Sequence, residues 1–266
     1  MSFNENFENG IVILGAGNVA THLSIALTNA GFKIKCIYSK TITAAKTLAL
    51  QVDSHYTNEI TQIPVEADLY IIAVKDEIIN EIVKNIQLKY GIIVHTAGSI
   101  PMDVFKGQFE NYGVFYPLQT FSKSRNIDYS NIPICIESNT QILEEKLVKL
   151  AKRLSRSVHI VDSEKRKILH LAAVFACNFS NHMFSIATEI MNQSGIPFDL
   201  LKPLIAETAQ KAIDTDPEKA QTGPAVRNDQ NVIQNHLEML KDNVEFEKIY
   251  RFVSESIYKM NQKKNK

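Results

Sequence analysis

This 266-residue sequence has no net charge, only three cysteines and no long apolar run. Its 29 lysine and arginine residues balance 29 aspartate and glutamate residues, so the formal net charge is zero. Binding to nucleic acid relies on an excess of positive charge that neutralises phosphates. The balanced composition therefore argues against a nucleic-acid partner and favours a small molecule or another protein.

The cysteines and the apolar runs exclude further classes. Cys36, Cys135 and Cys177 are odd in number, far apart and without CxxC spacing, which is typical of reduced, buried thiols and predicts neither a disulfide framework nor a metal site. The longest apolar stretch, Ile168–Phe179, is interrupted by His170 and is too short to cross a bilayer. Because the polar N-terminus also differs from a signal peptide, we expect a cytoplasmic protein without membrane contact.

Two hydrophobic patterns divide the chain. Up to about residue 161, short β-branched runs alternate with amphipathic stretches, which predicts a mostly parallel sheet with crossover helices. The predicted strands are Ile11–Leu14, Lys33–Tyr38, Leu69–Val74, Ile92–His95, Tyr112–Tyr116, Ile132–Glu137 and Val158–Val161. The predicted helices among them are Val19–Asn29, Thr43–Gln51, Asp76–Gln87 and Gln141–Leu154.

After Asp162 the strand pattern stops and only helical spacing remains. The predicted helices of this part are Ser163–Gln193, Phe198–Ile213, Val226–Leu240 and Glu245–Met260. The sequence thus predicts an α/β domain over residues 1–162 and an all-α domain over residues 163–266.

A glycine motif joins the first strand to the first helix. Gly15, Gly17 and Ala20 form the pattern GxGxxA, in which Gly15 permits a tight turn, Gly17 allows close backbone approach, and Ala20 keeps helix and strand together. A pyrophosphate would then lie over the free N–H groups at the helix start, near Asn18 and Val19. The motif predicts a Rossmann-type dinucleotide-binding domain, with a purely structural turn as the alternative.

The end of the second strand bears on the choice of dinucleotide. Sites selective for NAD usually carry Asp or Glu here, whereas this chain has Ser39, Lys40 and Thr41. Hydroxyl groups and a cation suit a 2′-phosphate, which favours NADP over NAD. The alternative is a solvated turn in which Ser39 or Thr41 caps the next helix.

Four further segments carry a family resemblance. They are AVKDEII from Ala73 to Ile79, HTAG from His95 to Gly98, YPLQTF from Tyr116 to Phe121 and TGPAVRND from Thr222 to Asp229. With them the chain resembles a group of uncharacterised Rossmann-like NADP oxidoreductases. That group lies in the superfamily of 6-phosphogluconate dehydrogenase, pyrroline-5-carboxylate reductase, prephenate dehydrogenase and deazaflavin-dependent NADP reductase.

The resemblance implies where ligands bind and how the chain assembles. It places Ala73, Val74, Lys75 and Thr96 along the cofactor, and it implies a homodimer paired through the helical domains. The substrate-binding residues that we predict beside the cofactor are Gly98, Tyr116, Gln119 and Arg227.

This chain also departs from the pattern of its relatives. Tyr116 stands where the group usually has His. The Lys-x-x-x-Asn pair of β-hydroxyacid dehydrogenases is missing, since Leu171 follows Lys167 at that spacing.

Hydride transfer also requires a group that moves a proton, and two histidines are candidates. His170 lies early in the long helix, with Asn178 eight positions further on and able to flank the same cleft. His95 ends a strand at the expected mouth of the site. The alternatives are a hydrogen-bonded core His170, an Asn178 that bridges helices, and a His95 that only shapes its loop.

Arg227 could grip a substrate carboxylate, or pair with Asp229 at a helix start. The sequence therefore predicts an NADP-dependent oxidoreductase acting on a small oxo, imino or hydroxy compound in a cleft between the two domains. The alternative is an NADP-binding sensor or interaction protein that catalyses nothing, and it is motivated by the missing Lys-x-x-x-Asn pair.

Overall fold

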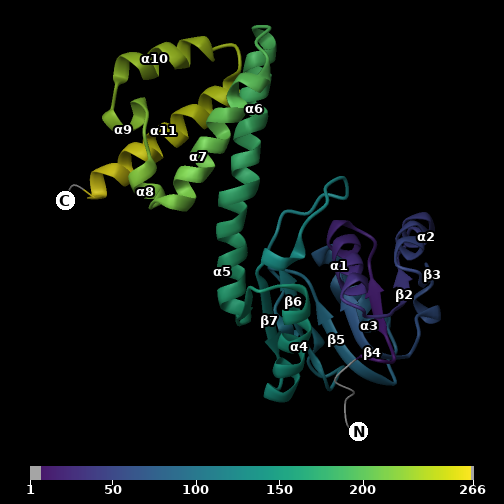
Figure 1. Cartoon of the computed structure of the whole chain (residues 1–266). Coiled ribbons are helices and arrows are strands. Elements are labelled where there is room, and N and C mark those ends of the chain that lie inside the picture. Colours follow the sequence, from purple (N-terminus) through teal and green to yellow (C-terminus); the bar gives the residue numbers. More distant parts are fainter. Residues whose placement is uncertain (1–6, 265–266) are drawn as a thin grey trace. The chain divides into compact units, whose positions relative to one another are not determined.

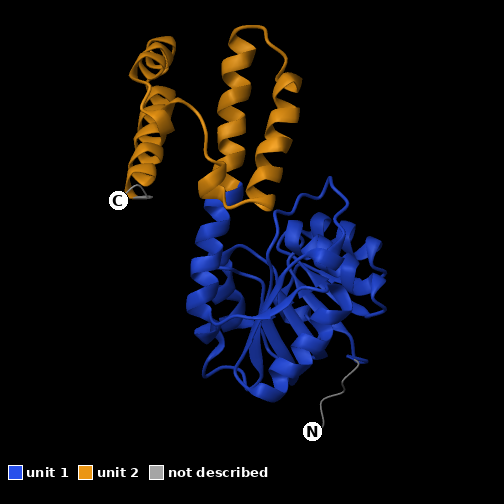
Figure 2. Cartoon of the chain, turned by 60° about the vertical axis from the view of Figure 1, so that its left-hand side comes forward, with its two compact units in different colours: residues 1–177 blue, residues 178–266 orange. Residues whose placement is uncertain are grey.

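The computed structural model describes residues 7–264, and the chain divides into two compact units, residues 1–177 and 178–266 (Figures 1 and 2). The first six residues, part of the polar N-terminus considered above, lie outside the described range. The division falls inside a π-helical segment, Val174–Phe179, whereas the change of sequence pattern falls after Asp162, where the last strand has ended.

Unit 1 is built on one eight-stranded sheet. Its strands are β1 Ile11–Leu14, β2 Ile34–Tyr38, β3 His55–Thr57, β4 Glu66–Ile72, β5 Tyr90–His95, β6 Tyr112–Pro117, β7 Ile134–Ser138 and β8 Val158–Ile160. They lie in the order β3-β2-β1-β4-β5-β6-β7-β8 (Figure 1). The order of the first six is that of the Rossmann fold, so the predicted fold class is confirmed.

One pair of strands departs from the parallel arrangement. β6 and β7 are antiparallel, with Phe115 opposite Ile136, whereas every other pair among the described strands is parallel. The connection from β6 to β7 contains only a short 3-10 helix, Tyr129–Asn131, and no α-helix. Parallel neighbours need a crossover connection, which is usually helical, so β7 returns along the opposite direction.

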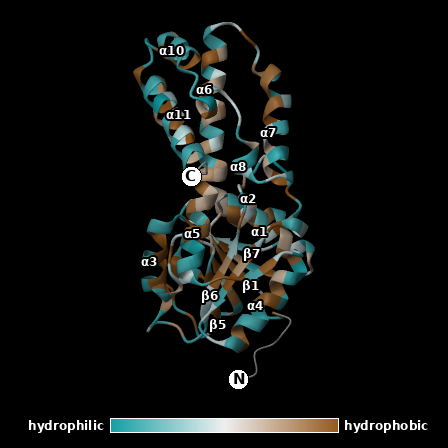
Figure 3. Ribbon diagram, turned by 90° about the vertical axis from the view of Figure 1, so that its left-hand side faces the viewer, coloured by the Kyte–Doolittle hydropathy of each residue, from teal (hydrophilic) through white to brown (hydrophobic). Residues whose placement is uncertain are grey.

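The helices of unit 1 cover both faces of the sheet. They are α1 Asn18–Asn29, α2 Ile42–Gln51, α3 Asp76–Asn85, α4 Gln141–Leu154 and α5 Ser163–Ala173. Alternate residues of β1 pack into two cores: Ile11 and Ile13 join α1, α2 and α4, while Val12 and Leu14 join α3. Burial on both faces explains the nearly continuous apolar strands, which Figure 3 colours as hydrophobic.

Unit 2 consists of helices. They are α6 Ser180–Gln193, α7 Lys202–Asp214, α8 Pro217–Ala220, α9 Pro224–Arg227, α10 Gln230–Met239 and α11 Val244–Lys264. The α9, α10 and α11 helices pack together, and the His236 Nδ1 atom and the Tyr250 hydroxyl share a hydrogen bond of 2.8 Å. Among the described hydrophobic side chains of this unit, only Ala225 and Leu237 are buried.

Several sequence predictions were wrong in detail. The strand β3 was missed because two of its three residues are exposed and show no apolar pattern. Ser163–Gln193 is not uniformly α-helical, since Val174–Phe179 is π-helical. Val226–Leu240 is not one helix, because Asn228 adopts a left-handed conformation with φ of 55° and Asp229 caps a new helix.

The cysteines only partly match the expectation of buried thiols. Cys36 and Cys135 are buried, and burial raises the pKa of both. Cys177 is exposed, so that part of the prediction was wrong. Within residues 7–264, no helix is long and apolar enough to span a membrane, and no cluster of three potential metal ligands occurs.

Candidate functional site

A cavity of about 670 Å³ lies wholly within unit 1, at the carboxyl ends of the strands around β1 and β4. Open α/β sheets bind ligands at this edge, where the strand order reverses. The structure brings almost all of the predicted residues together here. Those lining the cavity are Gly15, Gly17, Asn18, Val19, Ser39, Lys40, Thr41, Ala73, Val74, Lys75, Thr96, Gly98, Tyr116, Gln119 and His170.

The two glycines of the motif face different surroundings. Gly15 has a φ of +136°, and a Cβ atom added to it would lie 2.1 Å from the Ala73 carbonyl oxygen. The space beside Gly15 is therefore filled by the segment that directly follows β4. A Cβ atom added to Gly17 would meet nothing within 4 Å. The backbone at Gly17 is therefore open for the close approach of a ligand, and the space fits the pyrophosphate of a dinucleotide.

The connection from β6 to β7 holds the glycine loop from outside. Lys123 Nζ donates a hydrogen bond of 2.7 Å to the Ala16 carbonyl, and Asn18 Nδ2 donates one of 2.9 Å to the Phe121 carbonyl. The His22 Nε2 atom and the Ser122 carbonyl are 2.9 Å apart. The Asn18 side chain thus already has a protein partner, which leaves its backbone N–H for a ligand. These contacts span about a hundred residues of sequence and have no local sequence signal.

The Ser39-Lys40-Thr41 segment forms another wall, and Lys40 is paired there. Lys40 Nζ lies 2.8 and 2.9 Å from the two carboxylate oxygens of Glu81 on α3. That hydrogen bond raises the pKa of Lys40. The Ser39 hydroxyl accepts a hydrogen bond of 3.3 Å from the Thr41 N–H, and Thr41 begins α2 without a side-chain cap. Sequence reasoning found Lys40 but missed Glu81.

At another wall of the cavity, Tyr116, Gly98 and His170 meet. The Tyr116 hydroxyl and the His170 Nδ1 atom share a hydrogen bond of 3.0 Å, with the two rings edge to face. A Cβ atom added to Gly98 would lie 2.6 Å from the imidazole ring, so His170 packs directly on the backbone there. Burial raises the pKa of Tyr116 to about 12, which keeps the phenol protonated. The protonated phenol can donate to a neutral Nδ1 atom of His170 or accept from an Nδ1–H group, according to the tautomer of the ring.

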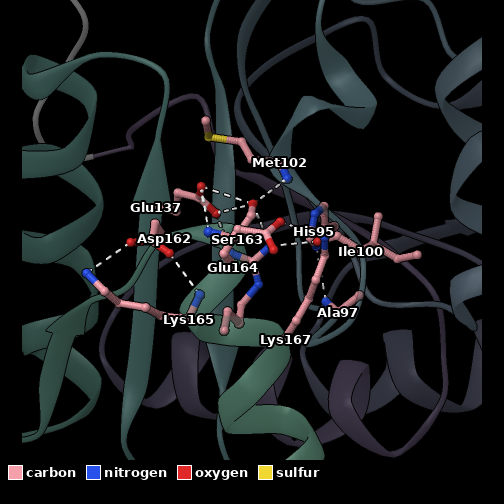
Figure 4. Close-up of polar contacts among 11 residues, drawn as sticks. His95, Ala97, Ile100, Met102, Glu137, Asp162, Ser163, Glu164, Lys165 and Lys167 are labelled. Carbon is pink, nitrogen blue, oxygen red and sulfur yellow. Dashed lines mark hydrogen bonds and ion pairs between the residues drawn. The ribbon is translucent and has the colours of Figure 1, made fainter.

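A buried polar network fixes the start of the helix that carries His170 (Figure 4). Arg166, one turn before His170, is fully buried and pairs with the Glu137 carboxylate on β7. Its guanidinium also donates to the Ile100 carbonyl at 2.6 Å. Ser163 donates to Glu137 from its backbone and its hydroxyl, and that hydroxyl accepts from the Met102 N–H at 3.0 Å. The network ties α5 to the segment that follows Gly98.

His95 is not brought to the cavity. It is fully buried beside Phe105, with the two ring centroids 5.6 Å apart and the rings tilted against each other. Its Nδ1 atom accepts a hydrogen bond of 3.2 Å from the Ala97 N–H. Burial first, and the charge of Arg166 second, lower the pKa of His95 to about 3. His95 thus stays neutral and shapes the loop, which is the alternative that the sequence left open.

Asn178 and Arg227 lie in unit 2, outside the cavity-lining set, and both are exposed. Arg227 ends α9, while Asp229 caps α10 by accepting from the Val232 N–H at 3.3 Å. The roles proposed for Asn178 and Arg227 stay predictions.

Strand order, glycine loop and cavity together define the Rossmann class of dinucleotide-binding folds. Two family models match the chain. One, described as NADP oxidoreductase coenzyme F420-dependent, matches residues 10–98, and a domain of unknown function, DUF2520, matches residues 132–257.

A comparison with solved structures shows the family to which this chain belongs. BF3122 from Bacteroides fragilis, assigned as an NADP oxidoreductase, is 46% identical with a TM-score of 0.90, over 95% of this chain and 99% of that one. The chain therefore belongs to the family of NADP oxidoreductases that includes BF3122.

More distant structures share the fold. Protein TM1727 from Thermotoga maritima is 21% identical with a TM-score of 0.70, over 96% of this chain and 100% of that one. An imine reductase from Myxococcus stipitatus in complex with NADP⁺ is 16% identical with a TM-score of 0.65, over 96% and 93% of the two chains. A comparison with curated proteins gave no match.

Proposed function

We propose that this protein is an NADP-dependent oxidoreductase that transfers hydride between the nicotinamide and a small oxo, imino or hydroxy compound. The observation that carries the proposal is that Gly17, Lys40, Tyr116 and His170 all line one cavity. The cavity offers an open backbone at Gly17 for the pyrophosphate, and a cation and hydroxyl groups for a 2′-phosphate. It also holds the hydrogen-bonded side chains of Tyr116 and His170. The complexes of distant relatives with NADP⁺ and NADPH agree with this choice of cofactor.

The bound nicotinamide supplies the hydride, and the chain has to orient the substrate and move one proton. We assign the proton to His170. In its protonated form, the imidazolium donates from Nδ1 to the Tyr116 hydroxyl oxygen and keeps the Nε2 proton for the substrate. In the reverse direction the neutral ring accepts that proton. Tyr116 holds the imidazole in one orientation, and Gly98 leaves room for it.

The substrate is proposed to lie against Gly98, Tyr116 and Gln119, which line the cavity beside His170. Cavity residues with mixed apolar and polar character suit a small organic compound. Lys75 and Asp76 at the start of α3 add charges of opposite sign to the wall, and Asp76 accepts a hydrogen bond from the Ser99 hydroxyl.

We further propose a homodimer formed through the helical unit. Large apolar side chains of this unit are exposed in the single chain, among them Leu204, Ile213, Met239 and Phe252. These exposed side chains lie on α7, α10 and α11 and support a protein contact through these helices. Sedimentation of the wild type should give twice the monomer mass, and Phe252→Glu should weaken the association. Leu50→Glu, in α2 of unit 1 and equally exposed, is the matched control.

Two measurements test the enzymatic proposal. Because the chain has no tryptophan, NADPH binding is followed by calorimetry or by the fluorescence of the nicotinamide itself. Turnover is then assayed with a panel of oxo and imino compounds, and His170→Ala should reduce kcat at least tenfold with the Kd for NADPH unchanged. Absence of NADPH and NADH binding would refute the proposal. Tight NADPH binding without turnover would instead indicate the NADP-binding sensor.

A further inference from the structure

The cation best placed for a 2′-phosphate is already engaged by an acid of the same unit. Lys40 Nζ is within hydrogen-bond distance of both Glu81 carboxylate oxygens, at 2.8 and 2.9 Å. Glu81 lies on α3 between Ile78 and Ile82, both of which line the cavity. A negative charge is therefore held next to the position where a phosphate would meet Lys40.

The pair is half exposed, with 57% of the Lys40 side chain and 53% of the Glu81 side chain accessible. Exposed ion pairs of this kind are weak and exchange partners readily. A dianionic phosphate can therefore take over the ammonium, but it has to compete with the carboxylate for the same donor. It also has to approach a like charge, which opposes binding.

Building on the proposed function, we propose that Glu81 determines how strongly the site prefers NADPH over NADH. Glu81 holds Lys40 while no phosphate is present and competes with the 2′-phosphate when NADPH binds. NADH has no 2′-phosphate, so its binding leaves the ion pair intact. Glu81 thus reduces the discrimination that Lys40 alone would give.

Removing the Glu81 carboxylate charge separates its effect on NADPH binding from its effect on NADH binding. Glu81→Gln should tighten NADPH binding by about two- to fivefold at low salt, the range set by an exposed pair, and should leave the Kd of NADH unchanged. The gain should shrink as salt is raised, because the charges are exposed. Lys40→Gln should weaken NADPH binding, and in the Lys40→Gln background Glu81→Gln should lose most of its effect.

Glu66→Gln is the matched control. It breaks an exposed ion pair of the same 2.8 Å length, between Lys89 Nζ and Glu66 Oε1, away from the cavity lining. This variant should leave the affinities for both cofactors unchanged. Thermal unfolding of each variant establishes that it is folded before calorimetry.

The outcomes are distinct. Unchanged NADPH affinity in Glu81→Gln, weaker NADPH binding, or an equal shift for NADPH and NADH would each overturn the role of Glu81 while leaving the proposed function intact. Failure of the wild type to bind either cofactor would overturn the proposed function itself, and the role of Glu81 with it.

Discussion

Alanine substitution should mainly lower the stability of the protein at Gly15 and mainly lower its affinity for NADPH at Gly17, although the two residues are separated only by Ala16. A Cβ atom at position 15 would overlap the Ala73 carbonyl at 2.1 Å and would sit on a backbone with φ of +136°. A Cβ atom at position 17 would enter open space. The first change therefore destabilises the folded protein, whereas the second mainly interferes with ligand binding.

The magnitudes follow from these contacts. Overpacking typically destabilises by about 1–3 kcal/mol and a strained backbone by about another 1–3 kcal/mol, so Gly15→Ala should lower the free energy of unfolding by about 2–6 kcal/mol. Gly17 begins α1, where alanine is a poorer cap, so Gly17→Ala should lower it by less than about 1 kcal/mol. Losing a charge-assisted backbone contact to the pyrophosphate costs about 1.5–3 kcal/mol, which weakens NADPH binding roughly 10- to 150-fold.

Urea unfolding followed by circular dichroism gives the stabilities, and calorimetry gives the NADPH affinity of each folded variant. Equal destabilisation of the two variants would refute the geometry of the glycine loop. A Gly17→Ala variant that binds NADPH as tightly as the wild type would refute the location of the pyrophosphate.

Further predictions concern the two histidines and the buried arginine. Arg166→Met should lower the free energy of unfolding by about 3–5 kcal/mol in urea, because it leaves the mostly buried Glu137 carboxylate without its partner; a loss below 1 kcal/mol would contradict this. Tyr116→Phe removes the 3.0 Å hydrogen bond to His170 and should displace the pH profile of turnover while the protein stays folded, and an unaltered profile would argue against the pair. Between about pH 3 and the ordinary value near 6.5, unfolded His95 binds a proton that folded His95 does not. Stability should therefore fall by about 1.4 kcal/mol per pH unit as pH drops below 6.5, and His95→Leu should remove that part of the slope in unfolding curves at pH 7.5 and 5.

The sequence was informative where local chemistry decides the structure. The strand, glycine loop and helix over residues 11–29 were predicted to within a residue, because apolar periodicity and the glycine motif are local signals. The placement of Ala73, Thr96 and Gly98 at the cavity follows from the rule that parallel strands end at one edge. The π-helical segment has no such signal, since its apolar residues keep an ordinary helical spacing.

Residues whose role depends on distant partners could not be assigned. Glu81 is 41 positions from Lys40, and Lys123 is 107 positions from Ala16, so no spacing rule links them. His95 is different, because the alternation of side chains along a strand indicates which core it faces. It lies two residues after Ile93 and so faces the same core, packed with α3, rather than the opposite core that contains Val94. Strand alternation therefore predicts the core in which the His95 side chain is buried.

The location of the whole cavity within unit 1 has a consequence for synthesis on the ribosome. Its lining runs from Gly15 to His170, so the proposed cofactor site is encoded before any residue of unit 2 is translated. Domains generally fold as units during translation, beginning at the N-terminus. Because Gly15 packs on Ala73, the glycine loop cannot take its final form until β4 has emerged and paired with β1. A nascent chain that has passed α5 could already hold NADP, and the bound dinucleotide would then stabilise the sheet while the helical unit is still being made.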